Sequence, residues 1–139
     1  MFNKILLGID ISDASMKAVE RVITLQKKFG SETIVFHSVT HQLNGKTPNI
    51  GYGFNTNAIS MTLQENDVDL GRTLLADVEE LFRRNELYVE ARLIYDISPE
   101  EYSKKQVEEE NFDLVVLGNH GSVANKVINH IQCDVLIVK

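Results

Sequence analysis

Four short segments of the sequence are apolar almost without interruption, and they restrict the possible folds more than any other feature. They cover residues 4–9, 33–39, 114–117 and 135–138. Strands buried on both faces need apolar side chains at nearly every position, and such strands occur in parallel sheets covered by helices. A fifth segment, residues 89–94, alternates between apolar and charged side chains, which is typical of a strand near a sheet edge.

Helical periodicity fills most of the intervals between these strands. The apolar positions predict helices over residues 12–29, 60–85, 99–109 and 122–130. Ser12 is placed to cap the first helix, and Gly30 follows its last turn. Ser98 and Pro99 begin a capping box, whereas Gly71 weakens the second helix. Strands that alternate with helices predict an α/β fold, a doubly wound parallel sheet with helices on both faces.

Length and charge limit the functions that the chain can serve. With 139 residues it is expected to form a single domain, residues 1–139. Its formal net charge of −6 argues against nonspecific binding to nucleic acid, which requires a basic surface. No apolar segment is long enough for a membrane span or a signal peptide, and the only cysteine is Cys133, expected to be a buried, inert thiol. We therefore expect a cytoplasmic protein without disulfides.

Three connections between the predicted elements are candidates for function. Residues 41–57 are rich in glycine and asparagine and lack periodicity, which predicts a long mobile loop, and such loops are often functional. Asp10 follows the first strand, and Gly118 and Gly121 follow the fourth. Open α/β sheets bind ligands at strand ends where the winding direction reverses, so these two turns are predicted to form one pocket. A glycine-rich helix start favours a phosphate, although the same glycines can simply permit a tight turn capped by Ser122.

Both ends of the sequence resemble the universal stress protein family. Residues 1–39 are similar to the family's opening, including the aspartate after the first strand and the histidine and valine of the second. The final segment, DLVVLGNHGSVANKVINHIQCDVLIVK, is similar to its ending, which typically shows Gly-x-His-Gly, then Gly-Ser-Val-Ala-x-Lys-Val, then a Cys-Pro-Val-Leu-Val-Val strand. This resemblance implies a five-stranded sheet of order 3-2-1-4-5 and a homodimer formed through the C-terminal strand.

In one branch of that family, ATP binds through Gly-x-x-Gly, nine residues, then Gly-Ser or Gly-Thr. Carried onto this sequence, the resemblance implies that Asp10 and the Val39 backbone flank the adenosine. The residues that it implies for the phosphates are Gly118, Gly121, Ser122 and Val123. The nine-residue spacer and one motif glycine are missing, so Gly121 serves as only one of two glycines. We therefore expect weak binding, or a preference for a smaller nucleotide such as AMP over ATP.

These observations favour a binding and signalling module of the universal stress protein type, with an adenine nucleotide as its ligand. The alternative is a dimeric interaction protein that has lost nucleotide binding, because the apolar segment 134–139 has no following helix to cover its edge. Enzyme activity such as slow ATP hydrolysis ranks third, since the sequence shows no general base or metal cluster. His120 is isolated in its turn, and His37 is expected to be a packed neutral imidazole.

A phosphoacceptor receiver domain is a weaker rival. Asp10 and Asp13 form a carboxylate pair at one strand end, and Asp96 follows the third strand, where that fold carries its acceptor. The receiver fold also needs a lysine after its fifth strand, followed by a helix, whereas the sequence stops at Lys139.

Overall fold

The computed structural model describes residues 1–39, 53–119 and 123–139. For residues 53–66 it describes the backbone alone. The described residues form, in order, β1 (Lys4–Gly8), α1 (Asp13–Phe29), β2 (Glu32–Val39), α3 (Gly53–Arg84), β3 (Glu90–Tyr95), α4 (Pro99–Glu110), β4 (Leu114–Gly118), α5 (Val123–His130) and β5 (Asp134–Val138). Every predicted strand is present, and no strand end differs from the prediction by more than one residue.

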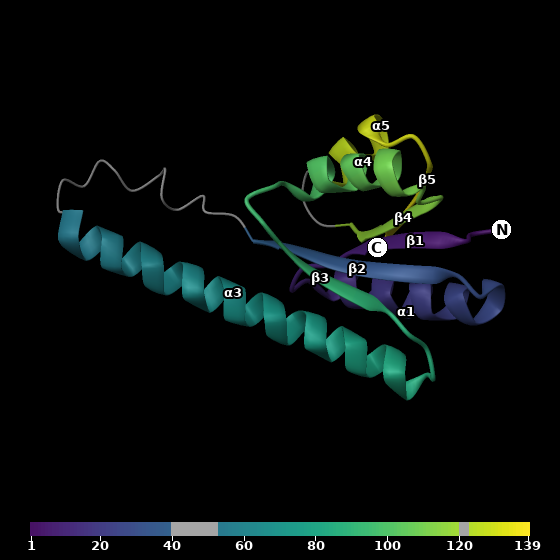
Figure 1. The fold of residues 1–139 in the computed structure, drawn as a ribbon, viewed down its shortest axis with the longest axis horizontal. Coiled ribbons are helices and arrows are strands. Elements are labelled where there is room, and N and C mark those ends of the chain that lie inside the picture. The colour runs from purple at the N-terminus through teal and green to yellow at the C-terminus, as the bar shows by residue number, and fades with distance from the viewer. Residues whose placement is uncertain (40–52, 120–122) are drawn as a thin grey trace.

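The five strands form one parallel sheet of order β3-β2-β1-β4-β5 (Figure 1). β1 lies at its centre, where Leu6 is paired with Ile34 of β2 and with Val115 of β4. β3 and β5 are the two edge strands. Because every pairing is parallel, all strands end on the same side, called here the carboxyl end of the sheet. The predicted α/β class and the strand order that the resemblance implied are both confirmed.

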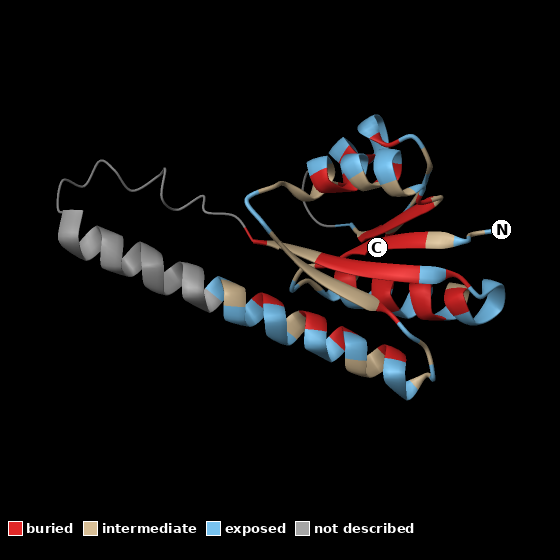
Figure 2. Ribbon diagram, in the orientation of Figure 1, coloured by how far each residue is buried: buried red, intermediate tan, exposed pale blue. Residues whose placement is uncertain are grey.

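Helices cover both faces of this sheet, which is why its central strands need continuous apolar sequence. Successive residues of a strand point to opposite faces. Ile5 and Leu7 of β1 pack with α1 and α3 on one face, whereas Leu6 packs with α4 and α5 on the other. The buried positions lie on the strands and on the helix sides that face them (Figure 2). The sheet therefore separates two apolar cores.

The helix ends follow the sequence signals. The Ser12 side chain accepts a hydrogen bond from the Ser15 amide at the start of α1, and Gly30 ends this helix in the left-handed conformation, with φ of 69°. Ser98 caps α4 in the same way through the Glu101 amide, directly ahead of the proline at the first position. The end of α4 is set by Asn111, also left-handed with φ of 58°.

Helix α3 is longer than the sequence predicted. It begins at Gly53, so the predicted loop over residues 41–57 is wrong for residues 53–57, and residues 40–52 lie outside the described part. The prediction failed there because glycine and asparagine are typical of loops, and the start of the helix has little apolar periodicity to indicate otherwise. At about 1.5 Å per residue the helix spans roughly 48 Å and extends past the strands (Figure 1). Within the described residues, no helix is both long and apolar enough to cross a membrane.

Gly71 explains how α3 comes so close to the sheet. A Cβ atom at this position would lie 2.9 Å from Cδ2 of His37 and 2.9 Å from Cδ1 of Leu93. Real Cβ atoms do not make such short contacts. The residue that weakens the helix in the sequence therefore allows it to pack on β2 and β3.

The charged residues of β3 face α4. The guanidinium of Arg92 donates to Tyr102 Oη at 3.0 Å, to Gln106 Oε1 at 3.1 Å and to Glu110 Oε2 at 3.1 Å, and it also pairs with Glu90. Partial burial alone would lower the pKa of Arg92, but the hydrogen bonds with Tyr102, Glu110 and Glu90 outweigh it and raise that pKa above its ordinary value. Arg92 therefore stays charged and joins the edge strand to α4.

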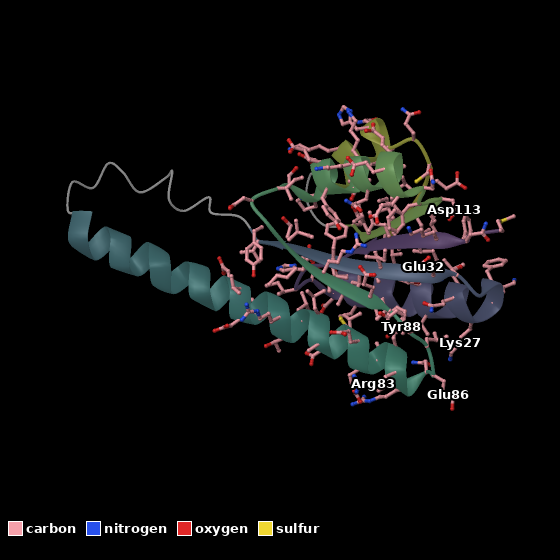
Figure 3. All side chains as sticks on the ribbon, viewed as in Figure 1. Lys27, Glu32, Arg83, Glu86, Tyr88 and Asp113 are labelled. Atoms are coloured by element: carbon pink, nitrogen blue, oxygen red, sulfur yellow. The ribbon has the colours of Figure 1, made fainter. Side chains whose placement is uncertain are left out.

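Asp113 fastens the opposite, amino end of the sheet. Its carboxylate oxygens accept hydrogen bonds from the amides of Asn3 and Lys4, both at 2.9 Å. The side chain thus lies beside the start of β1, far along the sheet from the carboxyl end (Figure 3). Lys4 Nζ also donates to the Glu110 carbonyl at 3.1 Å, so this end of the sheet is held by groups distant in sequence.

Candidate functional site

The turn from β1 to α1 holds Asp10 in a fixed position. Oδ1 of Asp10 accepts hydrogen bonds from the Ser12 amide and from Ser15 Oγ, both at 2.8 Å. The Asp10 amide in turn donates to Ser15 Oγ at 2.9 Å, and Ser15 itself is buried. The carboxylate at the carboxyl end of β1 is therefore part of the same network that starts helix α1.

The end of β4 lies directly against that helix start. A Cβ atom on Gly118 would lie 2.6 Å from the carbonyl carbon of Ala14 and 2.7 Å from the Ser15 amide nitrogen. Both are backbone atoms and cannot move aside, so only glycine fits here. Gly118 therefore has a packing role that does not require a ligand. The following residue, Asn119, donates its amide to the Val138 carbonyl at 2.7 Å.

A hollow of about 90 Å³, called here the inner hollow, lies between these two strand ends. Its lining includes Asp10, Gly118 and Val123, three of the residues that the resemblance implied. Among the described residues, Pro99 at the start of α4, Ser15 of α1 and residues at the ends of β1, β2 and β4 also line it. The first residue of α5 and Asp10 therefore line the same hollow, and their role in binding stays a prediction. Two further residues from that set, Gly121 and Ser122, lie outside the described residues, as does His120.

A larger cleft of about 240 Å³ adjoins the inner hollow and is called here the α3 cleft. It is lined by Asp10, Ile11, His37, Ser38, Val39, Asp67 and Leu70. The two hollows share three lining residues, Asp10, His37 and Ser38. Val39 reaches the α3 cleft at the last position of β2, and its carbonyl accepts a hydrogen bond from the Asp96 amide at 2.9 Å.

His37 lines both hollows, a position that the sequence did not predict. It is half-buried, and its Nδ1 lies 2.9 Å from the Ile9 carbonyl oxygen. Because a carbonyl oxygen only accepts, Nδ1 carries the proton, and Nε2 of the neutral ring is left as an acceptor. The signal was available in principle, since His37 lies two residues before Val39 near a strand end. Asp67 and Leu70 gave no such signal, because they reach the cleft only through the packing of α3.

A third hollow, of about 440 Å³, lies along the edge strand β5 and is called here the β5 groove. It is lined by Arg21, Thr24 and Leu25 of α1 and by residues 136–139. Leu136 is 36% exposed there. This groove lies at the edge that the sequence predicted to be uncovered.

Cys133, just ahead of β5, has no sign of reactivity. Burial, followed by the charges of Asp134 and Asp113, raises the pKa of its thiol to about 11. The thiol is therefore protonated at neutral pH, and the expectation of an inert thiol agrees with this environment, although the residue is only half-buried.

Among the described residues, no three histidine, cysteine, aspartate or glutamate side chains are grouped to hold a metal ion.

The strand order also answers the receiver-domain rival. In a receiver domain the third strand lies beside the first, with order 2-1-3-4-5. Here β3 is an edge strand, separated from β1 by β2. Asp96 therefore does not share a central cluster with Asp10 in the way that a phosphoacceptor needs, and the rival is wrong.

Strand order and the paired hollows at the carboxyl end define a doubly wound α/β protein with a candidate ligand site at its topological switch point. The model of the universal stress protein family matches residues 1–139, and the chain belongs to this family. A search of curated protein sequences finds no match.

Solved structures of the family share the fold. A family member from Burkholderia pseudomallei is 22% identical, with a TM-score of 0.79 over 99% of this chain and 96% of that one. A universal stress protein in complex with cAMP is 20% identical, with a TM-score of 0.70 over 99% and 96% of the two chains. A third, from Archaeoglobus fulgidus in complex with dAMP, is 18% identical, with a TM-score of 0.66 over 100% and 98%.

Proposed function

We propose that this protein is a binding and signalling module that holds an adenine nucleotide weakly where β1 and β4 end. The observation that carries the proposal is the adjacency of the inner hollow and the α3 cleft, which share Asp10. One hollow includes the start of α5, where backbone amides and the helix dipole favour a phosphate. The other includes Val39 and suits the adenosine.

The size of the site favours a nucleoside monophosphate over ATP. Ligand pockets in proteins typically measure about 300–1,000 Å³, and the α3 cleft and inner hollow measure about 240 and 90 Å³. The family motif that surrounds a triphosphate is shortened here between Gly121 and Ser122. Two relatives of the same fold are in complex with cAMP and dAMP, each of which carries a single phosphate. AMP is therefore the proposed ligand class.

Isothermal titration with AMP, ADP and ATP tests this proposal. We expect AMP to bind about tenfold more tightly than ATP, because the extra phosphates find few donors and lie close to Asp10. A titration that shows no heat with any of the three up to millimolar concentration would reject nucleotide binding.

Variants at the two turns locate the site. Gly121→Val and Asp10→Ala should each weaken the affinity for AMP. Since Asp10 also holds the amide of Ser12, Asp10→Asn is the sharper variant: it retains an oxygen acceptor for the turn and removes the charge. Asp13→Asn, in the first turn of α1 and outside both linings, is the matched control. Unchanged affinity in the first three variants would place the ligand elsewhere.

The β5 groove favours a second candidate function, a homodimer that recruits partners without a nucleotide. An apolar edge strand with an open groove beside it can pair with a second copy of the chain. Sedimentation at micromolar concentration tests this idea, and a monomer there would remove it. Slow ATP hydrolysis is not part of either proposal, and we expect phosphate release no faster than in buffer alone.

A further inference from the structure

The polar side chains that line the α3 cleft are acceptors. Asp10 and Asp67 present carboxylates, and Nε2 of His37 is an acceptor in the neutral ring because Nδ1 donates to the Ile9 carbonyl. The single hydroxyl proton of Ser38 is used in a hydrogen bond to the Ile97 carbonyl. Among the described residues of this lining, then, no side chain offers a donor to a ligand.

The charged residues that line the α3 cleft also favour a ligand group that donates hydrogen bonds. No lysine or arginine lines the α3 cleft within the described part of the chain, whereas two carboxylates do. The described lining of the inner hollow also has no lysine or arginine, but it holds one carboxylate instead of two and includes the start of α5, so a phosphate is favoured there over the cleft. The cleft suits an uncharged group that carries hydrogen-bond donors, such as an amino group or hydroxyls.

Of the two carboxylates that line the cleft, Asp67 has fewer hydrogen bonds within the protein than Asp10. Oδ1 of Asp10 already accepts two hydrogen bonds within its turn. The Asp67 side chain is exposed on α3, and among the described residues its carboxylate takes part in no hydrogen bond or ion pair. It lies one helical turn before Gly71, the point where α3 touches His37, so it is on the side of the helix that faces the cleft.

We propose that Asp67 makes the site selective for a 6-aminopurine over a 6-oxopurine. This inference rests on the proposed function, because it concerns the base of the same nucleotide. The exocyclic amino group of adenine donates, and a carboxylate acceptor strengthens such a bond. Hypoxanthine carries a carbonyl oxygen at that position, and two facing acceptors leave a polar group without a partner. Specificity arises here from the mismatch with the wrong base.

The test compares AMP with IMP, which differ in the group on C6 and in the proton on N1 and share the ribose and the phosphate. Titrations of the unmodified protein should show AMP binding about tenfold more tightly than IMP. Asp67→Asn supplies both a donor and an acceptor, so the ratio of the two affinities should fall to about one. Loss of a negative charge changes the affinity for both nucleotides alike, and the ratio cancels that effect. Asp69→Asn, exposed on the same helix and outside the cleft lining, should keep the tenfold ratio.

The outcomes separate this inference from the proposed function. Equal affinities for AMP and IMP in the unmodified protein, or an unchanged ratio in Asp67→Asn, would overturn the role of Asp67 and leave nucleotide binding standing. Tighter binding of IMP would overturn it as well. Absence of binding for both nucleotides would overturn the inference together with the proposed function.

Discussion

The two edge strands of the sheet, β3 and β5, differ in their charge and in how far other elements cover them. β3 carries Glu90 and Arg92, is joined to α4 by the hydrogen bonds of Arg92, and is packed closely by α3 at Gly71. β5 is apolar along most of its length and borders a groove of about 440 Å³. Charged side chains and covering elements protect sheet edges from pairing with other chains. One edge of this sheet is therefore closed, and the other is suited to an interface.

The largest expected effect is the loss of self-association when a charge is placed on β5. In Leu136→Lys, two lysines would meet where two copies of β5 pair, so self-association should weaken at least about a hundredfold. Sedimentation equilibrium measures the change, and circular dichroism verifies that the variant folds. Tyr95→Lys is the matched control on the other edge strand, where the side chain is 47% exposed, and it should leave self-association unchanged. A variant of Leu136 that dimerises as before would show that β5 is not the interface.

A larger side chain at Gly71 should weaken the packing of α3 against β3. The added methyl groups of Gly71→Val would meet the side chains of His37 and Leu93, so these side chains or α3 must shift, which should destabilise the fold by about 2 kcal/mol. Urea unfolding measures the loss. Ala76→Val, at an exposed position on the same helix, carries the same new side chain and should change the free energy of unfolding by about 0.5 kcal/mol or less. Equal effects of the two variants would contradict close packing at Gly71.

Removing the guanidinium of Arg92 should have a smaller effect on stability. Arg92→Met retains much of the aliphatic chain but leaves Glu90 and Glu110 without their partner, at a cost of about 1–2 kcal/mol. The Arg92 side chain is only 24% exposed, so solvent replaces little of the interaction. Arg83→Met is the control, because Arg83 pairs with Glu80 on an exposed face of α3, where such pairs contribute about 0.2–1 kcal/mol. A loss no larger than in the control would mean that Arg92 does not secure this edge.

The smallest expected effect is a pH dependence at Glu110. The hydrogen bond from Arg92 lowers the pKa of Glu110 in the folded protein, and burial opposes this shift. The stabilisation is therefore complete above the unfolded pKa of about 4.3 and is lost as the pH falls through the lower folded value. The difference in stability between the unmodified protein and Glu110→Gln should thus be largest at neutral pH and disappear in acid. A constant difference across the titration would argue against this charge pair.

The sequence was sufficient for the fold and for part of the site. Continuous apolar segments predicted the strands because both faces of the sheet are covered, and the serines that cap α1 and α4 marked their starts. The sequence also predicted that the strand ends carrying Asp10 and Gly118 meet, and both residues line the inner hollow. The start of α3 was misplaced because local composition hid it.

The remaining site residues depend on tertiary packing. Asp67 and Leu70 lie on a helix whose sequence contains no ligand motif, and they line the α3 cleft only because Gly71 lets that helix approach β2. His37 has the appearance of a core residue in the sequence, and only the structure shows that its Nδ1 bonds the Ile9 carbonyl and that the residue lines both hollows. Neither placement follows from the spacing of residues along the chain.

The parallel sheet also decides where an affinity tag or a fluorescent reporter is best attached. Residues before β1 leave the sheet beside Asp113, at the end remote from both hollows. Lys139 directly follows β5 and lines the β5 groove, and the preceding Val138 carbonyl is bonded to Asn119 beside Gly118. A fusion at Met1 should therefore leave binding and self-association measurements undisturbed, whereas one at Lys139 would occupy the β5 groove.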